Sequence, residues 1–421
     1  MATRLLIDGG RPLEGRVVIQ GSKNAALPLI AASLLTEEPV RLENIPDIRD
    51  VRVMADMVGR LGAEINWDRD GHVIDIRAKA LTSSAPDPDL TKKLRGSILL
   101  SGALLGRLRQ VTLPHPGGDA IGARPLQTHF RALEALGAQI SAGESITIDG
   151  LSLHGGDVTL EEPSVTATEN TILAAVLAPG KTVLRLAAYE PHVQELVAFL
   201  QKMGGEIRWR ENLQIEINGS RRLGGAQHRI NPDELEISSF ATLAAATRSD
   251  VTLEGIDPQY LDAVFLQLGK MGVAYERNGS SLRITPPRAA YQSFRVQSGL
   301  YPKLGSDHLP PFAVLATQAE GTSLIHDWLY EKRLNYIPEL QKMGANCRIL
   351  DPHRAVITGP TPLTGCAILS LDIRSGMTLV IAGLAAQGRT TIAGVGHLER
   401  GYERLEERLL AIGADIKRVN E

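Results

Sequence analysis

The sequence predicts an α/β (α+β) fold of two closed domains, each made of three copies of one αβ unit of about 70 residues. Two observations lead to this prediction. First, an amphipathic helix that ends in an apolar residue and a glycine, followed by a short strand, occurs six times. Second, other helical segments are apolar on nearly all sides. Such helices are expected inside a domain, with sheets covering them.

The repeated glycines follow one another at intervals of 67 to 75 residues, which is too regular for chance. Each is placed to end a helix in the left-handed conformation, so that the chain turns directly into a strand. A second marker, an Ala/Leu-rich helix followed by a turn and a β-branched strand, keeps the same interval. It covers residues 178–184, 248–253, 319–324 and 387–392. The glycines are Gly62, Gly137, Gly204, Gly272, Gly344 and Gly413.

These repeats set the expected domain boundaries. Residues 21–229 form the first three-repeat domain, which carries the loop 113–129, and residues 1–20 with 230–421 form the second. The helices over 25–35 and 172–177 are expected in a domain centre, and the short segments 5–7 and 16–20 are expected to pair with sheets of the second domain. A cleft between two domains would be the default ligand site.

Composition excludes several classes of protein. The 421 residues carry a net charge of −3 and contain no basic run, so nucleic acid and anionic membranes are not expected partners. The N-terminus lacks a signal-peptide pattern, and no segment is apolar for 18 residues, so we expect a cytoplasmic chain. Cys347 and Cys366 are too few for a disulfide framework or a Cys-based zinc site. We expect no metal, no cofactor and no obligate protein partner.

The loop 113–129 is the strongest candidate for a catalytic segment. It combines several glycines and prolines with Asp119 at its tip and Arg124 shortly after it. Glycines permit unusual backbone angles, and prolines restrict how far a loop can move. Composition alone also allows a surface loop with a solvated Asp119.

Lys23 follows a strand and begins a buried helix, with Ser22 as the expected N-cap. A lysine at a helix N-terminus can bind an anion, although a solvated lysine is the alternative. The glycine spacing differs from that of a Walker A loop, so nucleotide hydrolysis is not expected.

Five arginines stand at the ends of predicted elements, where a guanidinium can bind phosphate or carboxylate in a bidentate way. Each could equally form an ordinary surface ion pair. Two carboxylates, Asp307 and Glu190, lie beside residues that restrict the backbone, and each is either a base or a turn former. The arginines are Arg95, Arg124, Arg333, Arg374 and Arg400.

Four segments together resemble the enolpyruvyl transferase superfamily, and within it the enzymes that act on UDP-N-acetylglucosamine in the first committed step of peptidoglycan synthesis. They are residues 21–28 (GSKNAALP), 116–125 (PGGDAIGARP), 164–170 (SVTATEN) and 400–404 (RGYER). The resemblance covers essentially the whole chain. It implies two inside-out α/β barrels of three repeats each, and it favours a catalytic role for the loop 113–129.

The resemblance also implies a reaction: the enolpyruvyl group of phosphoenolpyruvate is transferred to the 3′-hydroxyl of a sugar nucleotide, and phosphate is released without a metal. Asp119 would deliver the proton, and Asp307 would act as the base near the attacking hydroxyl. Lys23, Arg124 and Arg400 would hold the charges of phosphoenolpyruvate, assisted by Arg333 and Arg374. The implied sugar-nucleotide contacts are Asn24, Arg95, Pro125, Leu126, Gln127, His129, Ser164, Val165, Glu190 and Leu329.

The chain departs from the family pattern at Asp119, where most relatives carry Cys. A carboxylic acid is a poor proton donor at neutral pH, so we expect desolvation on loop closure to raise the pKa of Asp119. The change also removes the thiol that fosfomycin alkylates, which predicts resistance.

Other departures concern the choice of acceptor. They are Gln127, Thr166, Glu234 and the segment 304–308. The alternatives are another nucleotide, as in nucleoside-antibiotic pathways, shikimate 3-phosphate, or a non-catalytic relative that binds a sugar nucleotide.

Overall fold

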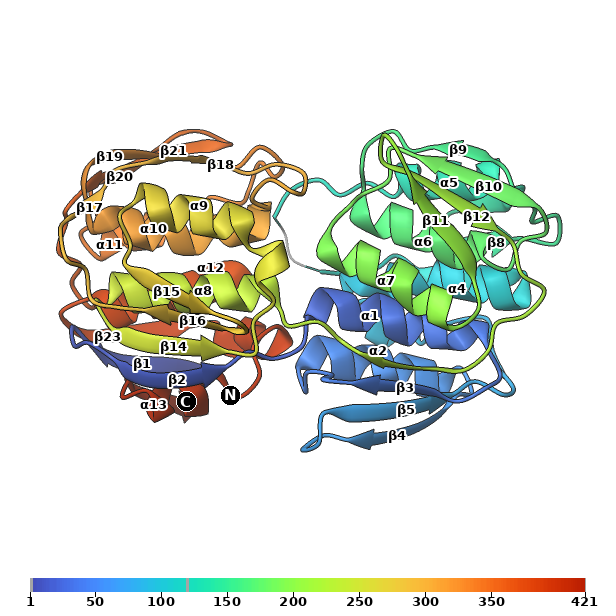
Figure 1. The fold of residues 1–421 in the computed structure, drawn as a ribbon, viewed down its shortest axis with the longest axis horizontal. Coiled ribbons are helices and arrows are strands. Elements are labelled where there is room, and N and C mark those ends of the chain that lie inside the picture. Colours follow the sequence, from blue (N-terminus) through green and yellow to red (C-terminus); the bar gives the residue numbers. More distant parts are fainter. Residues whose placement is uncertain (1–2, 119–120, 421) are drawn as a thin grey trace. The chain divides into compact units, whose positions relative to one another are not determined.

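The computed structural model describes residues 3–118 and 121–420, and the chain divides into two compact units (Figure 1). The first unit comprises Gly21–Asp119 and Arg124–Asn231. The second unit comprises Met1–Gln20, Ala120–Ala123 and Pro232–Glu421. In the described residues each unit contains three inner helices and three sheets, together with further helices outside the inner three.

The inner helices of the first unit are α1 (Lys23–Ala32), α4 (Leu99–Leu108) and α6 (Val165–Ala175), and α4 contacts both of the others. Its sheets have the strand orders β13-β3-β5-β4, β6-β8-β7 and β11-β12-β10-β9. Its other helices are α2 (Arg49–Arg60), α3 (Pro88–Thr91), α5 (Gln127–Ala135), α7 (Pro191–Lys202), η1 (Ser33–Leu35) and η2 (Arg95–Ile98). Its strands are β3 (Val40–Glu43), β4 (Glu64–Asp68), β5 (Val73–Arg77), β6 (Gln110–Pro114), β7 (Gln139–Ala142), β8 (Ser145–Asp149), β9 (Asp157–Thr159), β10 (Lys181–Arg185), β11 (Glu206–Arg210), β12 (Gln214–Asn218) and β13 (Ala226–Arg229).

The inner helices of the second unit are α8 (Glu234–Ala246), α10 (Leu309–Thr317) and α12 (Ile373–Ala385), which all contact one another. Its sheets have the orders β15-β16-β14-β2, β17-β19-β21-β20 with β18 beside β19, and β22-β23-β1-β24. Its other helices are α9 (Asp262–Lys270), α11 (Ile337–Lys342), α13 (Leu405–Ala411), η3 (Pro258–Tyr260), η4 (Ser306–His308) and η5 (Val395–Arg400). Its strands are β1 (Thr3–Gly9), β2 (Glu14–Val18), β14 (Asp250–Glu254), β15 (Tyr275–Asn278), β16 (Ser281–Ile284), β17 (Tyr291–Gln292), β18 (Arg295–Gln297), β19 (Ala319–His326), β20 (Cys347–Asp351), β21 (Arg354–Gly359), β22 (Ala367–Leu369), β23 (Gly388–Ala393) and β24 (Asp415–Asn420).

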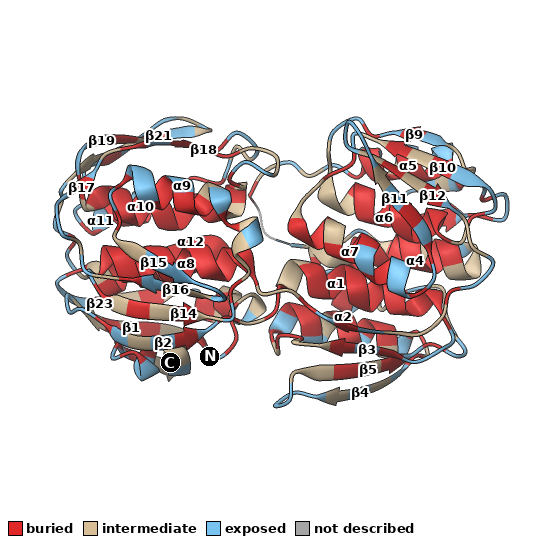
Figure 2. Cartoon of the chain, in the orientation of Figure 1, coloured by how far each residue is buried: buried red, intermediate tan, exposed pale blue. Residues whose placement is uncertain are grey.

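The inner helices are buried along their length. Every residue of α8 and α10 is buried, and so is every residue of α12 except the last (Figure 2). Their sequences are apolar on all sides, so they are stable only where neighbouring elements cover every face. The α/β fold class with helices inside the sheets, as predicted, is confirmed.

The six repeated glycines all adopt a positive φ, between +75° and +107°. The strand that follows each glycine, namely β4, β7, β11, β15, β20 or β24, lies at one edge of its sheet. The predicted left-handed turn from helix to strand is therefore confirmed six times.

The N-terminal strands complete sheets of the second unit, as expected. β1 pairs antiparallel with both β23 and β24, and β2 pairs parallel with β14. In the first unit, β13 pairs parallel with β3 from the opposite end of that unit's sequence. These pairings join the first and last repeats of each unit. No helix in residues 3–118 and 121–420 is long and apolar enough to span a membrane.

The repeated glycines allow a matched test of backbone strain. Gly204 and Gly137 have similar φ values of +91° and +86°, but a Cβ at Gly204 would meet no atom within 4 Å, whereas one at Gly137 would lie 2.6 Å from the Ser152 carbonyl oxygen. We expect Gly204→Ala to lower the free energy of unfolding by roughly 1–2 kcal/mol through the left-handed conformation alone. Gly137→Ala should cost more because it adds a clash. Urea denaturation measures both, and equal losses would contradict the structural difference.

Candidate functional site

Several of the predicted site residues lie at or just before the N-terminal ends of inner helices. In the first unit, Lys23 begins α1, Arg95 begins the η2 turn that leads into α4, and Val165 begins α6. In the second unit, Asp307 lies in the η4 turn before α10, and Arg374 lies in the first turn of α12. Helix N-termini present unpaired N–H groups and a partial positive charge, which favour anions.

Lys23 is mostly buried and pairs with Asp50 of α2 at 3.5 Å. Ser22 caps α1 as predicted, because its hydroxyl accepts from the Ala25 N–H at 3.4 Å. Lys23 is therefore held at a capped helix N-terminus, which is not the environment of a freely solvated lysine.

Arg95 anchors the end of the candidate loop. One of its Nη atoms donates to the Arg124 carbonyl oxygen. Two glycines allow the loop to approach closely: a Cβ at Gly117 would lie 1.7 Å from the Lys92 carbonyl oxygen, and one at Gly118 would lie 2.7 Å from the Arg95 Cβ. Larger residues cannot replace these glycines without moving the loop. Asp119, the predicted acid at its tip, lies outside the described residues.

Residues 121–123 of the same loop pack on a turn of the second unit. The Lys332 N–H donates to the Ile121 carbonyl oxygen at 3.1 Å, and the Ala123 N–H donates to the Glu331 carboxylate at 2.9 Å. The Glu331 carboxylate also accepts from its own backbone N–H, and this bond together with the one from the Ala123 N–H lowers the pKa of Glu331.

His129 is buried, and both of its ring nitrogens have partners inside the protein. Nε2 lies 3.1 Å from the Thr166 hydroxyl, and Nδ1 lies 3.0 Å from the Asn170 amide nitrogen. Burial, assisted by the Arg95 charge, lowers the pKa of His129 to about 3, so the ring is neutral at pH 7. The ring thus joins α5 to α6, and its predicted contact with a sugar nucleotide stays a prediction.

The remaining first-unit candidates lie around the start of α6 and α5. Ser164 caps α6 by accepting from the Ala167 N–H at 3.4 Å. Glu190 precedes α7 and faces the fully buried Glu169, whose pKa is raised well above its usual value by burial and by the Glu190 charge. Asn24, Val165 and Arg124 are half-buried, Leu126 is buried, and Pro125 and Gln127 are exposed.

Asp307 is the centre of the charged cluster in the second unit. Its carboxylate pairs with Arg333 and with the Arg374 Nε, the latter at 3.2 Å. Both arginine side chains are only 4% exposed, so neither forms an ordinary surface ion pair. The three side chains come from three separate segments of the chain and are brought together only by the fold.

Several residues that support this cluster were not predicted. Asp372 caps α12 through the Arg374 and Ser375 N–H groups and lies 3.7 Å from Arg333. The Ser375 hydroxyl oxygen accepts in return from the Asp372 N–H at 3.0 Å, which completes a capping box. Asp233 caps α8 in the same way through the Leu235 and Glu236 N–H groups. The signal for Asp372 was available, since Asp-x-x-Ser before an apolar run indicates a helix N-terminus.

Asp327 is a further buried carboxylate that the sequence did not reveal as important. It accepts from the Leu329 and Tyr330 N–H groups at 2.9 and 3.0 Å and from the Ser306 hydroxyl. It therefore shapes the turn that carries Leu329, whose side chain is 44% exposed. The other second-unit candidates are Glu234, which is buried at the start of α8, and Arg400, which is half-buried at the end of η5.

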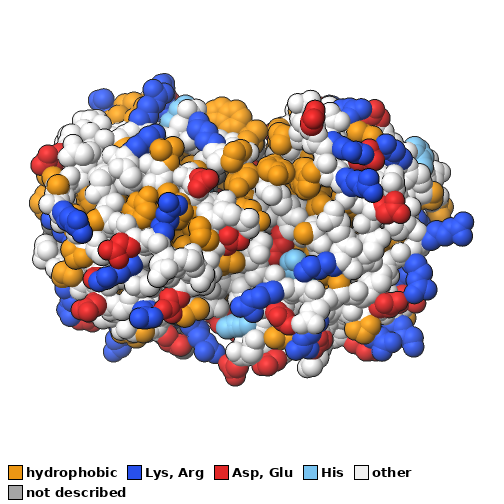
Figure 3. Space-filling model, viewed as in Figure 1, with side chains coloured by type: hydrophobic (Ala, Val, Ile, Leu, Met, Phe, Trp, Pro, Cys, Tyr) orange, Lys and Arg blue, Asp and Glu red, His pale blue; other side chains and the backbone are white. Residues whose placement is uncertain are grey.

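On the face drawn in Figure 3, Lys and Arg side chains are interspersed with Asp and Glu. Among residues 3–118 and 121–420, no group of three His, Cys, Asp or Glu side chains is arranged to hold a metal ion.

Comparison with known proteins identifies the family. The family described as EPSP synthase (3-phosphoshikimate 1-carboxyvinyltransferase) matches residues 7–409. The chain belongs to this family of enolpyruvyl transferases. It is therefore a carboxyvinyl transferase, as the sequence resemblance implied.

Individual relatives place the chain within the family. UDP-N-acetylglucosamine 1-carboxyvinyltransferases of Bradyrhizobium diazoefficiens and Treponema denticola are each 42% identical to it, over 99% and 98% of this chain and 98% of each relative. Among solved structures, the enolpyruvyl transferase NikO from Streptomyces tendae has a TM-score of 0.92 at 24% identity, covering 100% of this chain and 99% of that one. EPSP synthase from Acinetobacter baumannii has a TM-score of 0.77 at 20% identity, with both chains fully covered. Both structures share the fold.

The buried histidine next to Asp307 predicts a pH dependence of stability. His308 Nδ1 lies 2.8 Å from the Ser238 hydroxyl, and burial lowers the pKa of His308 to about 4. In the unfolded chain His308 binds a proton near pH 6.5, whereas in the folded protein it does so only near pH 4. The free energy of unfolding therefore has its full value above pH 6.5 and decreases as the pH falls toward 4. The variant His308→Asn lacks this titrating group, so its free energy of unfolding should decrease by up to about 3 kcal/mol less over the same pH range. Urea denaturation between pH 4 and 7 measures it, with the exposed His154→Asn as control, and parallel curves for all three proteins would contradict the assignment.

Proposed function

We propose that the protein transfers the enolpyruvyl group of phosphoenolpyruvate to the 3′-hydroxyl of UDP-N-acetylglucosamine and releases phosphate. The observation that carries this proposal is the full-length similarity, at 42% identity, to curated enzymes of that name. The reaction would be the first committed step of peptidoglycan synthesis in the cytoplasm, on which cell shape and division depend.

The charged residues suit this chemistry. In the addition step, the sugar hydroxyl attacks the carbon that bears the phosphate while an acid protonates the neighbouring methylene. In the elimination step, a proton leaves the resulting methyl group and the carbon–oxygen bond to phosphate breaks. We assign the acid to Asp119 and the base at the hydroxyl to Asp307. Both steps take place on a substrate with separate carboxylate and phosphate charges, which requires several cations.

Lys23, Arg124 and Arg400 would hold those charges, with Arg333 and Arg374 assisting. The burial of Arg333 and Arg374 supports this assignment, since a desolvated guanidinium that is already oriented binds an anion more strongly than a solvated one. The sugar nucleotide would contact Asn24, Arg95 and the residues 125–127, together with His129, Ser164, Val165, Glu190 and Leu329. The functional domains would be residues 21–229, which carry the loop 113–129, and residues 1–20 with 230–421.

The central prediction is turnover. Purified protein with phosphoenolpyruvate and UDP-N-acetylglucosamine should release phosphate and form a product whose mass includes the added enolpyruvyl group. Asp119→Ala should reduce kcat by at least about 100-fold, because it removes the proton donor. Asp70→Ala, a substitution of an exposed Asp outside the assigned site, is the matched control and should be as active as wild type.

The same assay with two other acceptors, performed in parallel, identifies the acceptor substrate. Turnover with UMP or shikimate 3-phosphate but not with UDP-N-acetylglucosamine would show that the acceptor has changed at positions such as Gln127 and Thr166. No turnover with any acceptor would favour a binding protein.

The carboxylate at position 119 also predicts resistance to fosfomycin. The drug is an epoxide that alkylates a thiolate, and a carboxylate is a much weaker nucleophile toward it. The intact mass of the wild-type protein should therefore stay unchanged after incubation with fosfomycin and sugar nucleotide. The variant Asp119→Cys should gain the mass of one fosfomycin molecule. Rapid modification of the wild-type protein would refute the prediction.

A further inference from the structure

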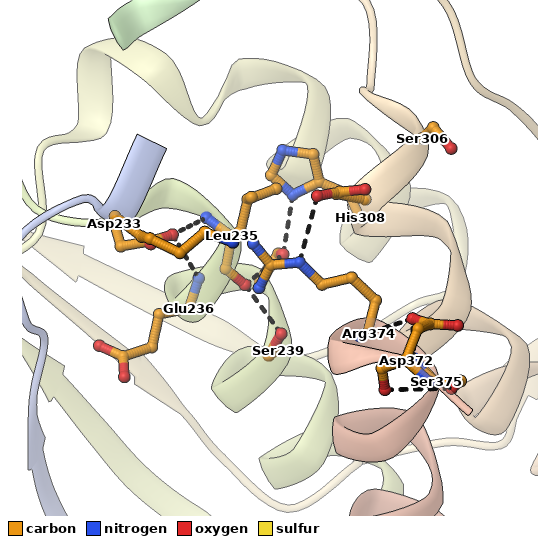
Figure 4. A network of polar contacts seen from close by, with 12 residues as sticks. Asp233, Leu235, Glu236, Ser239, Ser306, His308, Asp372, Arg374 and Ser375 are labelled. Carbon is orange, nitrogen blue, oxygen red and sulfur yellow. Dashed lines mark hydrogen bonds and ion pairs between the residues drawn. The ribbon is translucent and has the colours of Figure 1, made fainter. Parts of the chain in front are cut away.

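Tyr402 lies two residues after Arg400 and is buried, with 3% of its surface exposed. Its hydroxyl oxygen lies 3.1 Å from Arg374 Nη1 and 3.0 Å from the Ser239 hydroxyl. The Arg374 guanidinium carbon also lies 5.7 Å from the centre of the Tyr402 ring. One tyrosine thus connects α12, which carries Arg374, to α8, which carries Ser239; Arg374 and Ser239 are both labelled in Figure 4.

The chemistry of the partners fixes the direction of these hydrogen bonds. A guanidinium can only donate, so the Tyr402 oxygen accepts from Arg374. The Tyr402 hydrogen then donates to the Ser239 oxygen, because the Ser239 hydroxyl donates its own hydrogen to the Leu235 carbonyl oxygen at 2.8 Å. The result is one continuous chain of donors from Arg374 to the backbone of α8, and each bond polarises the next.

This series of hydrogen bonds fixes the Arg374 guanidinium at a second nitrogen, in addition to the one bound by Asp307. Asp307 accepts from Nε at 3.2 Å, and Tyr402 accepts from Nη1. A planar group with two fixed contacts at different nitrogens cannot rotate about its Cδ–Nε bond without breaking one of them. The direction of its remaining N–H groups is therefore set before any ligand arrives, which bidentate capture of a carboxylate or phosphate requires.

We propose that Tyr402 is a positioning residue for Arg374, and that its hydroxyl, held by Ser239, fixes the orientation in which Arg374 meets an anionic group of the substrate. This inference deepens the proposed function and rests on it for the identity of the anion, phosphoenolpyruvate. The competing explanation is that Tyr402 only fills the core between α8 and α12.

A second buried tyrosine in the same unit separates these explanations. Tyr291 is 1% exposed, and its hydroxyl donates at 2.8 Å to the Ala245 carbonyl oxygen, which lies near the C-terminal end of α8, beyond Ser239. Tyr402→Phe and Tyr291→Phe each remove one buried hydroxyl that is bonded to α8. Only the first removes a partner of Arg374, so a purely structural role predicts the same consequences for both.

The test compares the two variants with wild type in steady-state kinetics and thermal unfolding. We expect Tyr402→Phe to raise the KM for phosphoenolpyruvate about tenfold, the effect of losing one hydrogen bond to a charged group, with the KM for UDP-N-acetylglucosamine changed less than about twofold. Tyr291→Phe should keep both KM values, although it lowers the melting temperature. Equal kinetics for Tyr402→Phe and Tyr291→Phe would overturn the proposal.

Ser239→Ala gives an independent measurement that keeps Tyr402 in place. It should raise the same KM by a smaller factor, because it removes the acceptor that orients the Tyr402 hydroxyl. The double variant should be no worse than Tyr402→Phe alone, since both changes act through one hydroxyl. Additive effects would show that Ser239 does not act through the Tyr402 hydroxyl, and they would contradict the proposed series of hydrogen bonds.

Failure of the proposed function is recognised separately, because wild-type protein would then not turn over phosphoenolpyruvate. In that case crystal structures of wild type and Tyr402→Phe decide the inference. A changed or multiple Arg374 guanidinium orientation in the variant supports it, and an unchanged orientation overturns it.

Discussion

The structure depends on inner helices that are buried along most of their length. Such a helix has paired backbone groups everywhere except at its ends, where the first N–H groups need hydrogen-bond partners. The protein provides them with side chains: Ser22 and Ser164 cap α1 and α6, and Asp233 and Asp372 cap α8 and α12. The polar ends of otherwise apolar helices are thus a structural necessity, and these are the positions at which the charged candidate residues lie.

The N-termini of the three inner helices are capped in a similar order in both units. The first and third inner helices begin with a capping side chain, whereas the middle one follows a 3-10 turn, η2 in the first unit and η4 in the second. Arg95 and Asp307 occupy these two turns. Equivalent places in the fold therefore hold a cation in one unit and a carboxylate in the other, so the same backbone arrangement yields two different sites.

The sequence revealed most of the fold because the relevant signals are local. A glycine that ends a helix, an apolar helix and a β-branched strand are each recognisable within about ten residues, and regular repetition made them reliable. Lys23 and Arg374 could be chosen as candidates because each stands at the start of a recognisable helix. By contrast, the ion pairs of Asp307 with Arg333 and Arg374, and the bond from Tyr402 to Ser239, join segments 26 to 163 residues apart. No local pattern encodes such pairings, since they arise only when the three repeats of a unit close on one another.

The difference between the two kinds of cap explains why the second unit needs its arginines. A serine cap is neutral and leaves the positive end of the helix available to an anion, as at Lys23 on α1. An aspartate cap such as Asp372 places a full negative charge, 1% exposed, at the helix end. An unpaired buried charge is strongly unfavourable, so Asp372 requires a nearby cation, and Arg333 at 3.7 Å supplies one. Asp307 then pairs with both Arg333 and Arg374, so the cluster contains two carboxylates and two guanidinium groups and is balanced in charge. Removing Arg333 would leave the buried Asp372 carboxylate without this cation, so the position of Arg333 matters for folding as well as for anion binding.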